Sequence, residues 1–408
     1  HNGLPNMGKG LPMSSRGNIL VMQSGGCTPV INRSLYGVVS QALSTDEFCS
    51  IFGAIHGVEG LLSGNIVDLG RVSRTELNRI SRTPGAALGS TRQKLNVSDI
   101  EPILEQLRAR NIRSLFTIGG NDSAETGHSL HLAANNAGYE LAVVNVPKTI
   151  DNDLTETDHC PGYGSAARFI ALATFGAGQD ARSMGRAAPI TIIEVMGRDT
   201  GWLPAAAALV KRNAQDAPHI ICTPELPLNE DHFYQRIEEA YRNYGFAVAV
   251  IAENTRGPNG VLGEQEKPWF VDDFGHGYYD GPARYLASRV SQRLKVRARD
   301  EKPGTIQRSF VSAISSSDAK EAEMVGRAAV TAALDGHSDV IVTLVRDTGR
   351  QYKCTVGLAP LDKVAGLVRQ MPAEFLDADN LFVTRQFLDY ARPLVGRLPI
   401  APGGLPSA

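Results

Sequence analysis

The sequence predicts an α/β protein with two domains and mainly parallel sheets. Short apolar runs rich in β-branched residues, typical of buried strands, alternate with longer stretches of helical periodicity. Such alternation favours parallel sheets covered by helices. The number of strand–helix units suggests two sheets, and 408 residues are enough for two hydrophobic cores.

The elements follow one another through most of the chain. Strands are predicted at residues 18–23, 114–118, 141–146, 190–195, 219–222, 246–252, 310–314 and 340–345. Helices are predicted at residues 29–43, 98–110, from 123 onward, 202–210, 230–244, 280–294, 320–334 and 385–394. Ser98 followed by Glu101 is a capping-box pattern, which places an N-cap at Ser98. Residues 297–308 read as a basic connection, and residues 1–16 as a flexible tail rather than a signal peptide.

Composition excludes several classes of function. The formal net charge is −2, so a nucleic-acid partner is not expected. There is no run of eighteen apolar residues, so no membrane span is expected. The five cysteines are scattered without a CxxC pair, which is typical of reduced thiols in a cytoplasmic protein.

Three loops with ligand-binding chemistry follow predicted strands. Ser24-Gly25-Gly26 and residues 119–123 (GGNDS) each join a strand to a helix, a geometry that aims backbone N–H groups at phosphate. The third loop, residues 147–153 (PKTIDND), carries Lys148 and two carboxylates. Asp151 and Asp153 point the same way if the backbone is extended, so that one takes a proton while the other holds a hydroxyl or a metal. An Asp-Asn-Asp sequence alone is more often a solvated turn. However, α/β sheets bind ligands at the carboxyl ends of their strands. Three such loops at strand ends therefore predict a phosphate and metal site.

Residues 83–94 (TPGAALGSTRQK) form a fourth candidate loop. Its glycines allow a close approach of backbone to ligand, and Arg92 and Lys94 can meet phosphate oxygens. A surface loop with two solvated cations is an equally good interpretation when the loop is considered alone.

Taken together, these motifs resemble the phosphofructokinase family. The matching segments occur in the family order: SGG at 24–26, GSTR at 89–92, GGNDS at 119–123, PKTIDND at 147–153, EVMGR at 194–198, a strand ending in Glu253, and IQR at 306–308. The resemblance implies two Rossmann-like domains with the active site in the cleft between them. It assigns residues 17–160 and about 308–375 to a larger donor-binding domain, and residues 161–307 with part of the C-terminal segment to a smaller sugar-phosphate domain.

The resemblance also implies roles for individual residues. Asp151 is the base for the sugar 1-hydroxyl, Asp153 assists it, and Thr149 hydrogen-bonds the transferred phosphoryl group. The donor and magnesium side is implied to consist of Gly25, Gly26, Arg92, Gly120, Asp122 and Lys148, with Asn121 as a weak metal ligand. The sugar-phosphate side is implied to consist of Met196, Gly197, Arg198, Glu253 and Arg308, together with Thr149 and Asp151. Arg299 matches an arginine that reaches the neighbouring subunit's site, which implies a homodimer or homotetramer with shared active sites.

Two positions indicate the phosphoryl donor within this resemblance. ATP-using members carry Gly at the positions of Asp122 and Lys148, whereas pyrophosphate-using members carry Asp and Lys. Asp122 would repel a nucleotide α-phosphate, and Lys148 would neutralise the charge of a bare pyrophosphate. The expected reaction is therefore magnesium-dependent, reversible transfer from pyrophosphate to fructose 6-phosphate, a reaction of glycolysis.

Several departures keep alternatives open. Asn121 stands where many members have a metal-binding Asp, and a neutral carbonyl binds a hard cation less well. Thr305 replaces a common His or Tyr of the sugar site, and an arginine expected near Pro189 is missing, with Arg186 as a possible substitute. The alternatives are another acceptor, such as sedoheptulose 7-phosphate or a polyol, ATP as donor, and a catalytically silent regulatory subunit. A dinucleotide-dependent oxidoreductase would need a GxGxxG motif in the first turn, which this chain lacks.

Overall fold

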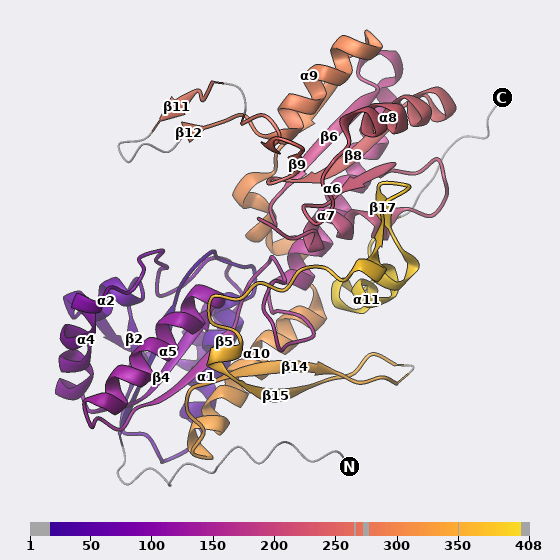
Figure 1. The fold of residues 1–408 in the computed structure, drawn as a ribbon. Coiled ribbons are helices and arrows are strands. Elements are labelled where there is room, and N and C mark those ends of the chain that lie inside the picture. Colours follow the sequence, from indigo (N-terminus) through magenta and orange to yellow (C-terminus); the bar gives the residue numbers. More distant parts are fainter. Residues whose placement is uncertain (1–16, 265–266, 272–276, 350, 401–408) are drawn as a thin grey trace. The chain divides into compact units, whose positions relative to one another are not determined.

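The chain forms two compact units in a computed structural model that describes residues 17–264, 267–271, 277–349 and 351–400 (Figure 1). The first unit contains the described residues up to Tyr163 and returns for Ser316–Arg369. The second contains Gly164–Ser315 and the described residues from Gln370 onward. The tail predicted at residues 1–16 lies outside the described residues.

The first unit is built on a seven-stranded sheet in the order β15-β14-β5-β4-β1-β2-β3. Neighbouring strands from β14 to β2 pair in parallel, whereas the edge strands β3 and β15 pair antiparallel. The chain moves from β1 to β2 on one side and later to β4 on the other, so the sheet has a switch point between β1 and β4, where such folds bind ligands. The strands are β1 (Asn18–Gln23), β2 (Ile51–Ala54), β3 (Ile66–Asp68), β4 (Ile112–Gly119), β5 (Ala142–Pro147), β14 (Val340–Arg346) and β15 (Cys354–Pro360).

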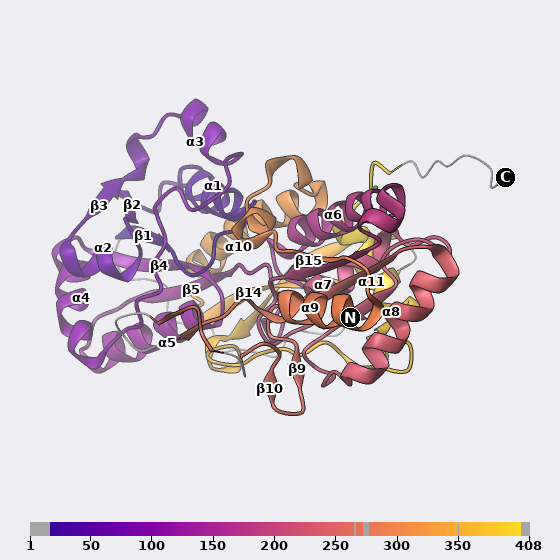
Figure 2. The same cartoon turned by 90° about the horizontal axis from the view of Figure 1, so that it is seen from above.

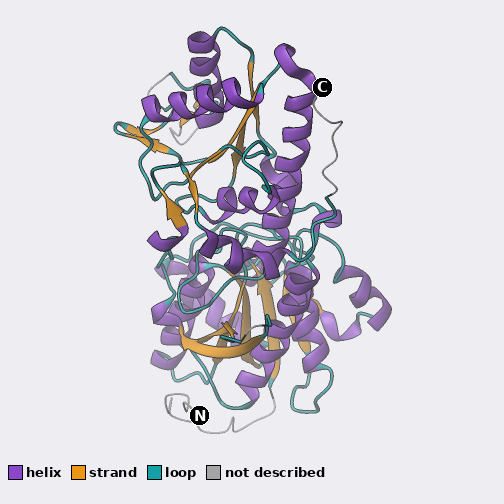
Figure 3. Cartoon of the chain, turned by 90° about the vertical axis from the view of Figure 1, so that its right-hand side faces the viewer, coloured by secondary structure: helices purple, strands orange, loops and turns teal. Residues whose placement is uncertain are grey.

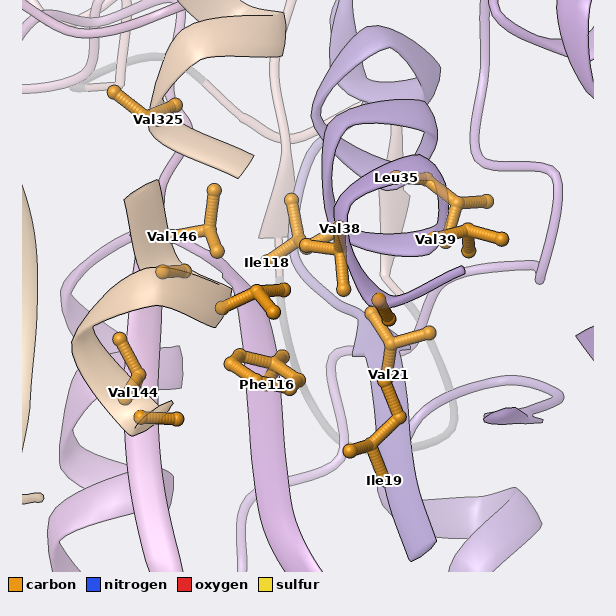
Figure 4. Packing of buried hydrophobic residues seen from close by; sticks show 14 of the residues in the cluster. Ile19, Val21, Leu35, Val38, Val39, Phe116, Ile118, Val144, Val146 and Val325 are labelled. Carbon is orange, nitrogen blue, oxygen red and sulfur yellow. The ribbon is translucent and has the colours of Figure 1, made fainter. Parts of the chain in front are cut away.

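Helices cover both faces of this sheet (Figure 3). Ile19 and Val21 of β1 pack with α1 (Ile31–Ala42) and α10 (Ser316–Leu334) in one cluster, shown in Figure 4. The alternate side chains Leu20 and Met22 pack with α4 (Val97–Ala109) and α5 (Asn121–Asn136) in another. The shorter helices α2 (Val58–Ser63) and α3 (Arg74–Ile80) follow β2 and β3. Each strand of the middle of the sheet is therefore buried on both sides, as expected of a parallel sheet.

Helices α1 and α10 cross at two glycines. A Cβ atom added at Gly37 would lie 2.3 Å from the Glu323 carbonyl oxygen, and one added at Gly326 would lie 2.2 Å from the Ser34 carbonyl oxygen. Only residues without a side chain allow the two backbones to come this close.

The second unit is built on a four-stranded, fully parallel sheet in the order β13-β6-β8-β7. Its strands are β6 (Ile190–Val195), β7 (Ile220–Cys222), β8 (Ala247–Ala252) and β13 (Ala298–Glu301). Side chains of α8 (Glu230–Tyr244) and α9 (Pro282–Leu294), both seen in Figure 2, pack on one face of the sheet. The remaining helices are α6 (Tyr163–Met184), α7 (Trp202–Ala206) and α11 (Arg385–Val395), and three two-stranded hairpins complete the unit: β9–β10 (Arg256–Gly257, Gly260–Val261), β11–β12 (Phe270–Val271, Gly277–Tyr278) and β16–β17 (Leu376–Asp377, Phe382–Val383).

The predicted fold class is confirmed, and most predicted elements are present, but four details are wrong. Residues 311–313 form a 3-10 turn rather than a strand. The segment predicted as a connection, residues 297–308, contains the edge strand β13. Its charged sequence, Ala-Arg-Asp-Glu, lacks the apolar residues by which a strand is usually recognised. Helix α4 begins at Val97 with Asn96 as its N-cap, and Asp99 accepts the Asn96 N–H at 2.9 Å. The α-helix beginning at Trp202 ends at Ala206 and continues as a 3-10 turn to Val210.

Among the described helices, none combines the length and the apolar character that crossing a membrane requires.

Candidate active site

In the first unit, the three predicted loops follow neighbouring strands. Strands β5, β4 and β1 lie side by side in parallel, so the loops after Pro147, Gly119 and Gln23 begin at the same edge of the sheet. Backbone bonds tie the loops together: Ser24 N–H donates to the Ile118 carbonyl at 3.1 Å, and Lys148 N–H to the Gly119 carbonyl at 3.1 Å. The sheet thus brings together the segments that the sequence singled out.

Lys148 reaches from β5 to the glycine turn after β1. The residue is 3% exposed, and its Nζ donates to the Gly26 carbonyl oxygen at 2.6 Å. Gly25 has φ +78°, and a Cβ atom there would lie 3.1 Å from the same Nζ. A glycine at this position therefore permits both the left-handed turn and the close approach of the ammonium group. The Lys148 amino group is therefore held against the glycine turn, at the sheet edge where the three loops begin.

The loop that carries the two carboxylates is not extended. Asn152 has φ +57°, so the extended backbone on which Asp151 and Asp153 would point the same way is not present. Asp153 is buried, whereas Asp151 is partly exposed. Thr149 Oγ1 accepts the Asp151 N–H at 3.0 Å, which leaves the Thr149 hydroxyl proton to be donated to another group. The two carboxylates therefore occupy different environments, which suits different roles.

The small-residue loop predicted at residues 83–94 is held by two polar side chains that sequence reasoning missed. Gln23 Oε1 accepts the Leu88 N–H at 2.9 Å, and Asn32 Oδ1 accepts the Ala87 N–H at 2.9 Å. Gln23 Nε2 in turn donates to Asn32 Oδ1 at 3.1 Å, and both residues are fully buried. Arg92, farther along the loop, is exposed. A polar residue at the end of an apolar strand was the available signal for Gln23.

The residues that could hold a divalent cation supply oxygen atoms. Asp122 is an exposed carboxylate in the first turn of α5. Asn121 is already engaged, since its Oδ1 accepts the Asp122 N–H at 3.0 Å and its Nδ2 donates to the Leu367 carbonyl at 3.3 Å. Carboxylate oxygens suit Mg²⁺ and Ca²⁺ rather than softer metals. The donor set therefore fits a hard cation, with Asp122 better placed than Asn121 to bind it.

In the second unit, the predicted sugar-phosphate residues also follow strands of one sheet. Met196, Gly197 and Arg198 come directly after β6, and Glu253 follows the neighbouring β8. Arg198 N–H donates to Glu253 Oε1 at 3.1 Å, which links the two strand ends. Gly197 has φ +140° and Arg198 φ +50°, so this turn has a conformation that few residues adopt.

Two further side chains hold this turn. The buried Gln307 accepts the Met196 N–H through Oε1 at 3.1 Å and donates to the Gly304 carbonyl at 2.8 Å, next to the half-buried Arg308. Glu225 Oε1 accepts the Gly201 N–H at 2.8 Å. Sequence reasoning did not identify either residue as a support. Arg299 lies on β13 and pairs with Asp180 of α6.

A buried polar network adjoins the end of the Asp151 loop. His159 is 1% exposed; its Nδ1 lies 2.8 Å from Asp158 Oδ2 and its Nε2 2.8 Å from Glu321 Oε2. Arg346 Nε donates to the same Asp158 oxygen at 3.0 Å. Burial alone would lower the pKa of His159, but the bonds to the two carboxylates outweigh it and raise the pKa. His159, Glu321 and Cys354 lie within metal-ligand reach of one another, yet the ring nitrogens are already committed to these carboxylates.

The comparisons with known proteins agree with this arrangement. The sequence pattern of the phosphofructokinase family matches residues 18–333. A protein of Xanthomonas campestris named pyrophosphate–fructose 6-phosphate 1-phosphotransferase is 36% identical, over 96% of this chain and 95% of its own length. One of the same name from Rhodospirillum rubrum is 37% identical, over 96% of both. The crystal structure of a pyrophosphate-dependent phosphofructokinase from Marinobacter aquaeolei superposes with a TM-score of 0.85 at 33% identity, covering 95% of this chain and 94% of that one.

Proposed function

Because the chain belongs to the phosphofructokinase family, we propose that it transfers a phosphoryl group from pyrophosphate to the 1-hydroxyl of fructose 6-phosphate. The products are fructose 1,6-bisphosphate and phosphate. The observation that carries the proposal is Lys148, a buried ammonium group fixed 2.6 Å from the Gly26 carbonyl at the loop that bears Asp151. The similar proteins named above use pyrophosphate, which favours this donor over ATP, and their names give no support to another acceptor or to a silent subunit.

The proposed mechanism depends on positioning and charge, since phosphoryl transfer leaves little covalent work to the protein. The Asp151 carboxylate accepts the proton of the sugar 1-hydroxyl. The hydroxyl oxygen at the same time attacks one phosphorus atom of pyrophosphate. The bond from that phosphorus to the bridging oxygen breaks, and phosphate leaves. Thr149, whose Oγ1 accepts the Asp151 N–H, donates its hydroxyl proton to the moving phosphoryl group. Lys148 neutralises the charge on the donor, and Asp153 orients the acceptor.

We propose that the first unit binds the donor and the second the sugar phosphate. Gly25, Gly26, Arg92, Gly120 and Asp122 belong to the first unit, whereas Met196, Gly197, Arg198, Glu253 and Arg308 belong to the second. The family uses a divalent metal, and we propose Mg²⁺, held mainly by Asp122, with Asn121 as a weak ligand. It would offset the negative charge of pyrophosphate during transfer.

We also propose a cytoplasmic enzyme that assembles as a homodimer or homotetramer. The five free cysteines suit a reducing compartment. Arg299 would contribute to a neighbouring subunit's site in place of its bond to Asp180. Light scattering of the purified protein measures the size of the assembly.

The test is turnover of fructose 6-phosphate with Mg²⁺, with pyrophosphate and ATP compared in one assay. We expect turnover with pyrophosphate and none with ATP. Asp151→Asn should lower kcat by roughly 10²–10⁴-fold, the usual effect of removing a general base, without unfolding the protein. Turnover with ATP alone would refute the donor assignment. Full activity of Asp151→Asn would refute the assignment of the base.

A further inference from the structure

The segment that follows the two carboxylates must be held by something other than regular structure. Residues 152–161 contain neither helix nor strand, although Asn152, Asp153 and Leu154 are buried. Buried backbone carbonyls need hydrogen-bond donors. Four of these carbonyls are bonded by one residue that lies more than two hundred residues away in the sequence.

That residue is Arg369. Its Nη2 and Nε donate to the Asn152 carbonyl oxygen at 2.8 and 3.2 Å. Its Nη1 donates to the carbonyl oxygens of Thr157 and Asp158, both at 2.6 Å. Its backbone N–H donates to the Asp153 carbonyl oxygen at 2.7 Å. One residue therefore binds the carbonyls of Asn152 and Asp153 and also those of Thr157 and Asp158 farther along the same loop.

The chemistry of this arrangement requires a guanidinium group. Its N–H donors spread in a plane and are permanently charged, so they bond several carbonyls in different directions at once. The three donors of a lysine share one nitrogen and cannot span from Asn152 to Asp158. A second bond reinforces the loop, because Asn152 Oδ1 accepts the Cys160 N–H at 2.9 Å while Asn152 itself has φ +57°.

We propose that Arg369 is a positioning residue for phosphoryl transfer, because it fixes the loop on which Asp151 and Asp153 are presented. The inference rests on the proposed function and adds a residue to it. A displacement of about 1 Å at a reacting group can cost roughly 10²-fold in rate. Loss of the guanidinium group should therefore act on kcat more than on substrate binding.

The test compares Arg369→Gln and Arg369→Lys with the wild type. Both variants keep the backbone bond to Asp153, so the loop is loosened rather than released. We expect kcat to fall about 100-fold in Arg369→Gln and less in Arg369→Lys, with KM for fructose 6-phosphate within threefold of wild type. Hydrogen exchange followed by mass spectrometry should show faster exchange in peptides covering residues 151–162 and little change elsewhere.

Arg168→Gln is the matched control. Arg168 also donates to two backbone carbonyls, those of Val395 and Arg397, but both belong to the second unit and neither to this loop. The kcat of Arg168→Gln should remain near that of the wild type after correction for the folded fraction. If Arg369→Gln does not fold, Arg369→Lys alone decides the question.

Three results are distinguishable. A wild-type protein without pyrophosphate-dependent turnover refutes the proposed function, whatever the variants do. An active wild type with an unchanged kcat in both folded Arg369 variants refutes the positioning role. Equal acceleration of exchange throughout the first unit also refutes it, since Arg369 would then contribute only to general stability.

Discussion

His159 and Glu321 together link three segments of the first unit. The His159 ring joins Asp158, at the end of the Asp151 loop, to Glu321 on α10, and Tyr352 next to β15 donates to the other oxygen of Glu321 at 2.5 Å. Because the bonds to carboxylates raise its pKa despite burial, the imidazole remains charged in the folded protein above the pH at which it loses its proton when unfolded.

The resulting stability should depend on pH. Because the pKa of His159 is higher in the folded than in the unfolded protein, its charge stabilises the fold fully at pH values below the unfolded pKa of about 6.5. This stabilisation is lost as the pH rises through the folded pKa. His159→Gln should lower the free energy of unfolding by about 3–5 kcal/mol at pH 6, as expected for breaking a buried charge pair, and by less at pH 9. Urea unfolding at both pH values measures this, with His232→Gln on α8 as control. An equal loss at both pH values would show that the charge is irrelevant.

The sequence made some of these residues predictable and not others. Lys148, Asp151 and Arg198 lie in compact motifs directly after strands, where local sequence reports both the residue and its place. Arg369 and Glu321 act on a loop more than 150 residues away, and nothing local marks them. Asn152 was misjudged because a left-handed residue inside a polar loop has no periodicity to reveal it.

At the scale of elements, the contact between α1 and α10 joins the beginning of the first unit to its returning segment. The two backbones approach at Gly37 and Gly326 so closely that a methyl group would collide with a carbonyl oxygen. Gly326→Ala should therefore destabilise the protein by about 1–3 kcal/mol, the usual cost of overpacking, even though alanine favours helix. Thermal or urea unfolding measures the change.

Gly336→Ala is not a suitable control, because Gly336 has φ +83°. Gly176→Ala in α6 is suitable, since outside the adjoining turns of its own helix no atom lies within 4 Å of the added Cβ. It should be neutral or stabilising. A Gly326→Ala protein as stable as the wild type would show that the two helices can separate without cost.

The elements that the sequence predicted share a clear period or a β-branched apolar run, as in β5, β6 and α8. Two of the elements it missed, α6 and β13, lack both. Helix α6 is rich in Ala and Gly over 22 residues and shows weak contrast between its faces. Strand β13 is Ala-Arg-Asp-Glu at a sheet edge, where charged side chains reach solvent and the backbone pairing with β6 fixes the structure.

At the scale of the whole molecule, the two units have separate sheets and separate cores. If the first binds pyrophosphate and the second fructose 6-phosphate, each ligand should protect its own unit. A ligand at about 100 times its Kd stabilises the state that binds it by about 2.7 kcal/mol. Hydrogen exchange with each ligand alone measures the effect.

Pyrophosphate with Mg²⁺ should slow exchange after β1 and β4, and fructose 6-phosphate should slow it after β6 and β8. The loop after β5 contacts both ligands in the proposed mechanism and does not distinguish them. ATP is the control and should protect neither set. Protection of the opposite unit would reverse the assignment of the two domains.

The first unit is interrupted in the chain by most of the second, which has a consequence for synthesis on the ribosome. When β5 has been translated, its partner β14 and the covering helix α10 are still more than 150 residues away. Until they emerge, the nascent chain presents one side of β5 as an unpaired strand and leaves Val144 and Val146 without the α10 side of their cluster. Such edges pair readily with other chains. The four-stranded sheet of the second unit has all its strands available by β13, before β14 and α10 are translated, although this unit also receives a last segment from Gln370 onward.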